Sequence, residues 1–255
     1  MATAAKILVI EDEAAIRAGL TDALVYHGYA VECAADGNRG LESALSGRFD
    51  LVLLDLMLPG RDGFEICNEI RKVDRRQPII MLTARASDED IIKGLSLGAD
   101  DYVAKPFSVA QLVLRIQAVL RRTRADLDGV QHLELDGGIR VDMENLSGSR
   151  GEQALTFTRR EIDLLRYLQA HSERPVAREE LLNKVWGYDR NADIETRTVD
   201  IHIAKLRRKI EVDPKQPVNL MTVRGAGRSL TLALHRLDGM PVNAVRIPFE
   251  EIGVR

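Results

Sequence analysis

Short aliphatic runs alternate five times with longer segments of helical period between residues 6 and 124. The helical segments show apolar residues at every fourth position, as at Ile16, Leu20 and Leu24. Strands that alternate with helices pair side by side through crossover connections, so the pattern predicts a doubly wound α/β domain on a parallel sheet. Its five strands are expected at 6–10, 30–34, 50–54, 79–83 and 102–104.

Polar residues follow four of these runs directly. Asp55 comes after the buried run 51–54, Glu11 and Asp12 come after 6–10, and Thr83 and Lys105 close or follow the fourth and fifth runs. Because the carboxyl ends of parallel strands meet at one edge of an open sheet, we expect these side chains to form one site.

Three neighbouring carboxylates are the ligands that Mg²⁺ prefers. A cation of this kind offsets the repulsion between Asp55 and an incoming phosphoryl group, while Lys105 and Thr83 can hold phosphoryl oxygens. The covalent species that this arrangement would support is an aspartyl phosphate on Asp55.

The pattern changes at residues 121–131, which lose helical period and gather charge. We therefore predict domains at 1–124 and 132–236, a linker at 125–131 and a tail of unknown role at 237–255. Three short strands are expected after the linker, with turns at Gly137-Gly138 and at Ser147-Gly148.

Thr158 and Glu161 have the spacing of a capping box, which predicts that a helix begins there. Two further helices are expected at 178–186 and 194–211, and runs at 218–223 and 229–234 predict a closing hairpin. This half of the chain is therefore expected to be an α+β domain.

The basic excess is local. Residues 155–236 hold 16 basic and 11 acidic side chains, whereas residues 1–124 hold 16 and 18, and the whole chain has a net charge of −3. On the helix expected at 194–211, an apolar face lies opposite a basic face, which favours docking on the domain through one side and DNA through the other.

Composition indicates the cellular compartment and argues against disulfide bonds and a zinc site. The two cysteines, Cys33 and Cys67, have neither disulfide nor zinc spacing, which favours a reducing cytosol. The sequence has no secretory pattern and no apolar stretch of spanning length, so a cytoplasmic protein without a membrane partner is expected.

Residues 5–122 resemble the receiver domain of two-component response regulators, through Glu11-Asp12, Asp55 with Pro59-Gly60, Thr83-Ala84 and Lys105-Pro106-Phe107. The resemblance implies a flavodoxin-like sheet in the order 2-1-3-4-5 and a cis Lys105–Pro106 peptide. It implies that Asp55 accepts phosphate from a sensor histidine kinase, and that Mg²⁺ is held by Glu11, Asp12, Asp55 and the Met57 carbonyl.

The same resemblance makes Thr83 and Tyr102 a coupled switch, in which Thr83 moves to the phosphoryl group and the aromatic ring turns inward. It implies a protein that is not an enzyme, although its receiver assists its own phosphoryl transfer and dephosphorylation.

Residues 131–235 resemble the winged-helix DNA-binding domain of the OmpR/PhoB class, through the run 197–210 and through 222–227. Position by position, the resemblance implies phosphate contacts from Arg197, His202, Arg207 and Thr222, base contacts from Asp200 and Lys205, and a minor-groove contact from Arg224. From the helical wheel, Ile201 is expected to meet a thymine methyl group. Arg228-Ser229 replace the family's usual Gly-Tyr in the wing, which leaves the packing of the wing open.

Together the two resemblances imply a phosphorylation-controlled transcription regulator that binds tandem DNA sites as a homodimer. They leave RNA polymerase as a possible protein partner. Ile91 and Gln111 replace one ion pair of the family's dimer face, which should weaken the dimer. The interface is expected to use Lys93, Leu95, Asp100, Asp101, Arg115 and Arg122, with Asp101 pairing Arg115 and Asp100 pairing Arg122 across the dimer.

Two other functions stay open. One is an orphan regulator that binds DNA without phosphorylation. The other is a metal-dependent phosphohydrolase with Asp55 as nucleophile, against which stands Met57 at the position where such enzymes carry a general acid.

Overall fold

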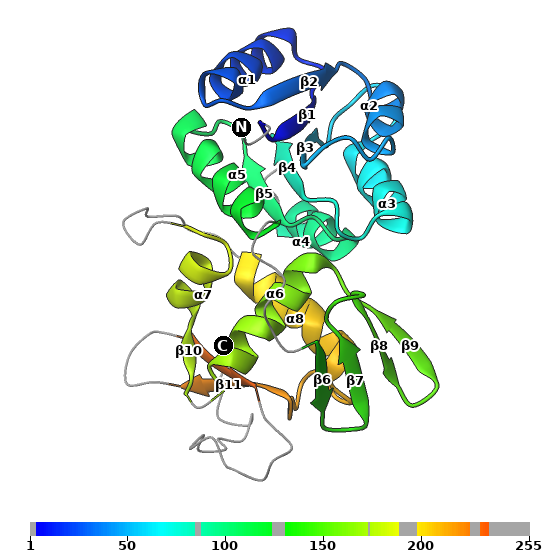
Figure 1. Cartoon of the computed structure of the whole chain (residues 1–255), viewed down its shortest axis with the longest axis vertical. Helices are drawn as coiled ribbons and strands as arrows, with labels where there is room; N and C mark the ends of the chain where they lie inside the picture. Colours follow the sequence, from blue (N-terminus) through cyan, green and yellow to red (C-terminus); the bar gives the residue numbers. More distant parts are fainter. Residues whose placement is uncertain are drawn as a thin grey trace. The chain divides into compact units, whose positions relative to one another are not determined.

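The computed structural model describes residues 4–84, 88–123, 131–172, 174–188, 198–224 and 230–234. The chain divides into two compact units, which are treated separately (Figure 1). Unit 1 comprises Met1–Asp128 with Trp186–Tyr188, and unit 2 comprises Gly129–Val185 with Asp189–Arg255. The predicted linker 125–131, apart from residue 131, and the predicted tail 237–255 lie outside the described residues.

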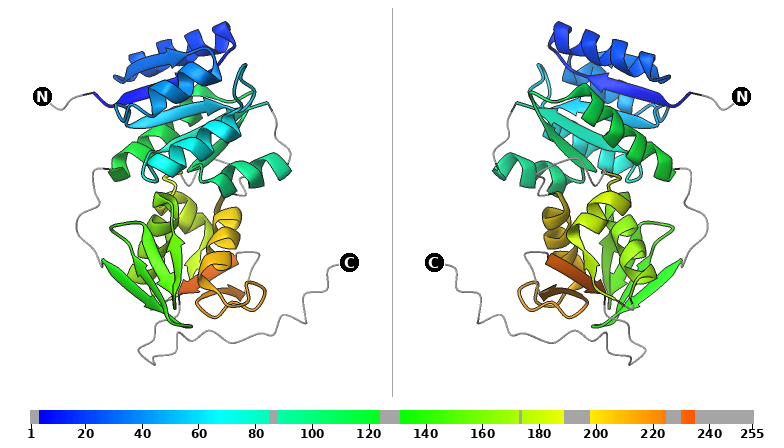
Figure 2. Two further views of the ribbon diagram at one scale, coloured as in Figure 1. Left: turned by 90° about the vertical axis from the view of Figure 1, so that its right-hand side faces the viewer. Right: turned by 90° about the vertical axis from the view of Figure 1, so that its left-hand side faces the viewer.

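Unit 1 is a parallel sheet with helices on both faces (Figure 2). The strand order is β2-β1-β3-β4-β5, which confirms the predicted doubly wound fold. The strands are β1 Lys6–Ile10, β2 Ala30–Ala34, β3 Leu51–Asp55, β4 Ile79–Thr83 and β5 Asp101–Ala104, and the helices are α1 Ala14–Tyr26, α2 Gly37–Ala44, α3 Gly63–Val73, α4 Asp88–Leu97 and α5 Val109–Thr123.

The central strands carry aliphatic side chains toward both faces, since β3 and β4 are buried along their whole length. One face packs against α1 and α5 in a cluster that includes Ile7, Leu53, Leu24 and Ile116. Each such side chain removed from water contributes about 1.5–3 kcal/mol. The register places Asp55 beside Leu82 and Thr83 beside Ala104, so the polar strand ends share one edge of a rigid sheet.

Unit 2 begins with a four-stranded antiparallel sheet, where the sequence predicted three strands. Ser147-Gly148 is part of the third strand, so the turn predicted there is wrong. The chain turns earlier, at Leu146, whose φ of 52° is left-handed. The strands are β6 His132–Leu135, β7 Ile139–Asp142, β8 Ser147–Arg150 and β9 Gln153–Thr156.

The described part of unit 2 also contains three helices and a second small sheet. The helices are α6 Arg159–Ala170, α7 Arg178–Lys184 and α8 Thr198–Ile210. The second sheet has the order β10-β12-β11, from Val176–Ala177, Leu230–Leu234 and Leu220–Arg224. Both halves of the capping box before α6 are present, because Thr158 accepts from the Glu161 N–H and Glu161 accepts from the Thr158 N–H.

A polar cluster joins the end of α6 to the start of α7. Glu180 accepts hydrogen bonds from Arg174 at 2.6 and 2.9 Å and from the Tyr167 hydroxyl at 2.6 Å. The Arg174 hydrogen bonds, joined by that of Tyr167, outweigh partial desolvation and lower the pKa of Glu180 from 4.5 to about 2. The cluster therefore links α6 to α7 most strongly while Glu180 is ionised.

Because the folded-state pKa of Glu180 lies below its unfolded value, the stability it contributes is present above about pH 4.5 and is lost as the pH falls toward 2. Solvent screening limits this contribution to about 0–1 kcal/mol. We expect Glu180→Gln to lower the free energy of unfolding at pH 7 and to be closer to wild type at pH 3, as measured by urea unfolding. An equal deficit at both pH values would show that the charge is not responsible.

Candidate functional site

Three carboxylates gather at the carboxyl edge of the unit 1 sheet. Glu11 and Asp12 follow β1, Asp55 ends β3, and each offers an oxygen within 4.8 Å of the other two. Glu11 and Asp55 are buried, at 0% and 3% exposure, while Asp12 is exposed. The structure thus brings together the acidic set that the sequence predicted.

Lys105 reaches this cluster from the end of β5. Its Nζ lies 2.8 Å from Asp55 Oδ2 and 2.8 Å from Glu11 Oε2. Burial opposes the charge of Lys105, but the hydrogen bonds to Asp55 and Glu11 outweigh it and raise its pKa. The peptide between Lys105 and Pro106 is cis, as the resemblance implied.

Main-chain groups around Asp55 determine how its two carboxylate oxygens are directed. Asp55 Oδ1 accepts from the N–H of Leu56 at 2.6 Å and from that of Met57 at 3.3 Å, which directs Oδ2 to Lys105. Gly63 packs so closely that a Cβ there would lie 2.3 Å from the Asp55 carbonyl oxygen. Arg17 fixes the opposite wall by donating to the carbonyls of Glu11 at 2.7 Å and Asp12 at 2.9 Å.

These residues fit a divalent cation. Every available donor atom is oxygen, the set that Mg²⁺ prefers. Lys105 contacts both oxygens of Glu11, at 3.0 and 2.8 Å, yet burial, reinforced by the charge of Asp55, raises the pKa of Glu11. A second cation would neutralise the negative charge of the carboxylates that Lys105 leaves uncompensated. Met57, whose carbonyl was the fourth predicted ligand, lies on the adjoining loop two residues after Asp55.

The predicted switch residues lie side by side on neighbouring strands. Thr83 is fully buried, and the ring of Tyr102 is 6% exposed, so the ring already lies inward. Burial raises the pKa of Tyr102 to about 12, against the effect of its hydrogen bond with Thr83. The inward turn that the resemblance implied is therefore not needed to bury this ring.

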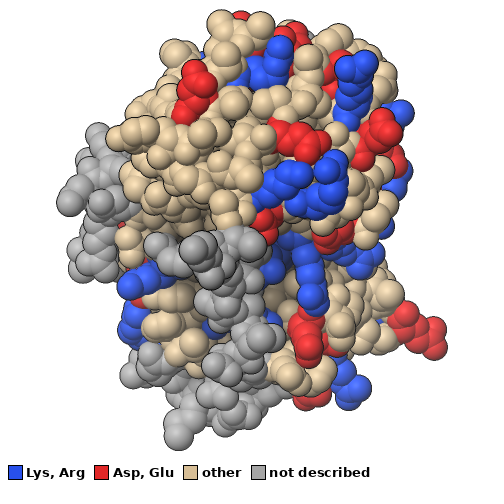
Figure 3. Space-filling view, turned by 45° about the horizontal axis from the view of Figure 1, so that its top comes forward, with Lys and Arg blue, Asp and Glu red and all other residues tan. Residues whose placement is uncertain are grey.

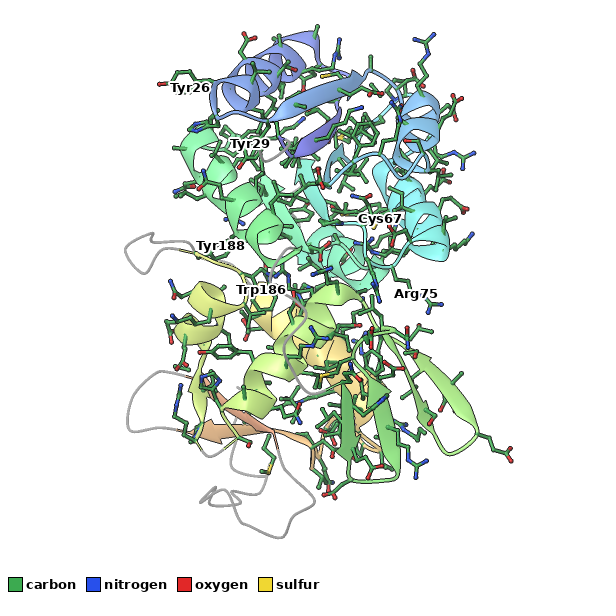
Figure 4. The ribbon with its side chains drawn as sticks, in the orientation of Figure 1. Tyr26, Tyr29, Cys67, Arg75, Trp186 and Tyr188 are labelled. Atoms are coloured by element: carbon green, nitrogen blue, oxygen red, sulfur yellow. The ribbon has the colours of Figure 1, made fainter. Side chains whose placement is uncertain are left out.

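The residues predicted for a dimer face already have partners inside unit 1. Arg115 donates to Asp101 Oδ2 at 2.9 Å, and Tyr188, which belongs to unit 1, donates to the same oxygen at 2.6 Å (Figure 4). Asp100 is 3% exposed and binds Arg71 at 3.0 Å, so its carboxylate already has a partner within unit 1.

The other members of that set differ in exposure. Leu95 is fully buried, and its place at a dimer interface stays a prediction. Lys93 is exposed, with its ammonium 4.2 Å from the ring centroid of Phe64. The side chain of Arg122 lies outside the described residues.

Helix α8 exposes a narrow face in unit 2. Asp200, Ala204 and Arg208 are exposed, and Ile201 is half-buried beside them. Asp200 forms an ion pair with Arg178 of α7 at 3.1 Å, which links the start of α8 to α7. Arg208 was on the predicted basic face but was not among the predicted contacts, and its exposure marks it as available for DNA.

Two of the predicted contacts point inward. His202 is 1% exposed, its Nδ1 lies 2.8 Å from the Thr198 carbonyl, and burial lowers its pKa to about 4. A phosphate contact from this ring would require it to leave that position. Lys205 is 13% exposed and lies 3.4 Å from Glu161, a residue that sequence reasoning recognised only as a cap.

The structure brings together two predicted phosphate contacts. Arg207 donates to the Thr222 hydroxyl at 2.8 Å and to the Leu220 carbonyl at 2.9 Å, which ties α8 to β11. Arg150 of β8 donates to the carbonyls of Lys209 and Glu211 at the end of α8. Its role could not be read from the sequence, because it depends on a contact across 59 residues of chain. Arg197, the side chain of Arg224 and the wing residues Arg228-Ser229 lie outside the described residues.

Charge is spread rather than gathered on the face of the molecule drawn in Figure 3, where basic and acidic side chains are interspersed. Among the described residues, no helix combines the length and apolar character needed to cross a membrane.

Comparisons with known proteins divide the chain in the same way. A family model described as the response regulator receiver domain matches residues 7–117, and one described as the C-terminal part of transcriptional regulatory proteins matches residues 151–230. A solved mutant of RitR is 29% identical, with a TM-score of 0.67 over 91% of this chain and 99% of that one.

Two further structures are similar at a lower TM-score. DrrB of Thermotoga maritima, described as an OmpR/PhoB homologue, is 27% identical over 91% of this chain and 99% of that one, with a TM-score of 0.49. A CheY-like receiver protein of Methanospirillum hungatei is 31% identical over 49% of this chain and 99% of that one, with a TM-score of 0.47.

Lys105 occupies the carboxylates that a cation would bind, so the two positive charges compete in part. We expect Lys105→Met to bind Mg²⁺ several-fold more tightly than wild type, and Asp12→Asn to bind it more weakly, as measured by calorimetry. Arg17→Lys, which keeps a donor near the Glu11 and Asp12 carbonyls, serves as a control close to wild type. Weaker Mg²⁺ binding in Lys105→Met would contradict the competition.

Proposed function

The chain belongs to the two-component response regulators of OmpR/PhoB type, and we propose that it takes a phosphoryl group on Asp55 from a sensor histidine kinase and thereby controls its binding to double-stranded DNA. The observation that carries the proposal is the buried Asp55 carboxylate beside Lys105 and two further carboxylates. In this proposal residues 1–124 are the receiver, 125–131 the linker and 132–236 the DNA-binding domain.

In the proposed transfer, an Asp55 oxygen attacks the phosphorus of a phosphohistidine, and the imidazole leaves with the bonding electron pair. Oδ2 is the candidate nucleophile, because Oδ1 is occupied by two main-chain N–H groups. Lys105 then exchanges its contact with Asp55 for one with a phosphoryl oxygen, and the Thr83 hydroxyl can donate to another. Mg²⁺ held by Glu11, Asp12, Asp55 and the Met57 carbonyl would offset the remaining negative charge.

The same residues support no separate enzymatic activity. Met57 stands two residues after Asp55, is 52% exposed and has no group that can act as an acid. A phosphohydrolase would need such a group to release an alkoxide. Turnover is therefore confined, in this proposal, to the protein's own phosphorylation and dephosphorylation.

For dimer formation we propose the surface of α4, β5 and α5, with DNA bound at tandem sites. Asp101 and Arg115, now paired within unit 1, would exchange that contact for one between protomers. Because this pair is buried, the exchange requires the partner protomer to replace the contact that each side chain loses. Partners in such an assembly include RNA polymerase.

The acceptor assignment can be tested by labelling. With acetyl phosphate and Mg²⁺, we expect the wild type to gain one phosphoryl group and Asp55→Asn to gain none, as measured by intact mass. Asp62→Asn is the matched control, since Asp62 is exposed and only caps α3. Equal labelling of Asp55→Asn and wild type would place the acceptor elsewhere.

DNA binding can be tested on a random duplex. Arg207→Ala removes a side chain that we assign to phosphate, so the log K against log salt slope should fall in magnitude by about one. Arg140→Ala, an exposed arginine on β7 paired with Glu134, should leave the slope unchanged. If the two variants behave alike, Arg207 makes no phosphate contact.

A further inference from the structure

Glu161 is a fully buried carboxylate at the start of α6, with 0% exposure. One oxygen, Oε2, accepts from the Thr158 N–H at 2.8 Å and completes the capping box. A neutral glutamine would serve that purpose equally well. The negative charge therefore needs another explanation.

Two lysines of α8 explain why Glu161 carries a negative charge. Lys209 Nζ lies 2.6 Å from Glu161 Oε2, and Lys205 Nζ lies 3.4 Å from Glu161 Oε1. Burial acts to raise the pKa of Glu161, but the charges of the two lysines outweigh it and hold the pKa below its usual range. Glu161 is thus ionised, and it ties α6 to the basic side of α8.

The two lysines are held differently. Lys209 also donates to the Thr156 carbonyl at 2.8 Å and lies over the ring of Phe157. Lys205 has the longer contact with Glu161, and it lies directly beside the exposed Ala204. Of the two, Lys205 is the one that a small movement would bring to the open face of the helix.

We propose that Glu161 is a positioning residue that keeps Lys205 off the DNA backbone and releases it only where a base edge compensates for the lost ion pair. This inference rests on the proposed DNA binding by unit 2. On random DNA, Lys205 would gain only a solvated phosphate contact and would stay with Glu161. At a preferred site, guanine O6 and N7 offer two acceptors in a groove shielded from water.

The arrangement raises specificity by weakening non-specific binding. A lysine that is free to bind any phosphate strengthens binding to every sequence and so lowers the ratio of specific to non-specific affinity. The carboxylate removes that contribution from random DNA. Specificity is then partly determined by a residue that need never touch the DNA.

Glu161→Gln tests the role of the charge, because an amide keeps the cap on Thr158. With the full chain and a random duplex, we expect the log K against log salt slope to grow in magnitude by about one, since Glu161 no longer keeps Lys205 from a phosphate. Glu161→Gln/Lys205→Ala should return the slope to the wild-type value. An unchanged slope in folded Glu161→Gln would overturn the proposal.

Lys205→Ala in the wild-type background gives a second test that does not alter the buried carboxylate. It should leave the salt slope on random DNA unchanged, yet weaken binding about 5- to 150-fold at a site selected from a random library, the loss of one base contact. A fall of about one in the random-DNA slope would show that Lys205 is an ordinary phosphate contact, and would overturn the proposal. Wild-type protein that binds no duplex at low salt would instead overturn the DNA-binding function itself.

Discussion

Lys105 holds together a pocket whose charges would otherwise repel. Its ammonium lies 2.8 Å from carboxylates on two different strand ends, Asp55 after β3 and Glu11 after β1. One cation cannot neutralise two buried carboxylates with Asp12 beside them, and burial, together with the charge of Asp55, raises the pKa of Glu11. The rest of unit 1 supports this cluster: the sheet fixes the strand ends, and Arg17 fixes the β1–α1 loop.

In unit 2 the buried charged cluster has an excess of positive rather than negative charge. There a single buried carboxylate, Glu161, meets two lysines, and the excess is positive. An excess of this kind suits a surface that approaches DNA, as an excess of carboxylate suits a metal ion and a phosphoryl group.

The sequence predicted the receiver fold well because each of its signals is local. The strand runs and the polar residues that follow them lie next to one another in the chain, and the parallel topology brings the strand ends together. The capping box at Thr158 was predicted for the same reason. Ser147-Gly148 was misread as a turn, because small polar residues favour turns and nothing local shows that β8 pairs with both β7 and β9.

Contacts between residues far apart in the chain could not be predicted from the sequence. Helical spacing placed Lys205 near the outer face of α8, but not its partner 44 positions earlier in the numbering. The same spacing could not show that His202 and Leu95 are buried, or that Asp100 is bound by Arg71. In each case the side chain is of a type common on surfaces or at interfaces, and a tertiary contact decides its position.

The central claim is that the chemistry at Asp55 controls DNA binding by unit 2. The most direct measurement is the affinity of the full chain for its selected DNA site before and after treatment with acetyl phosphate and Mg²⁺, with Asp55→Asn in parallel. The account predicts that treatment raises the affinity of the wild type at least several-fold and leaves Asp55→Asn unchanged. Equal affinity in all four samples would contradict it and would favour a regulator that binds DNA independently of phosphorylation.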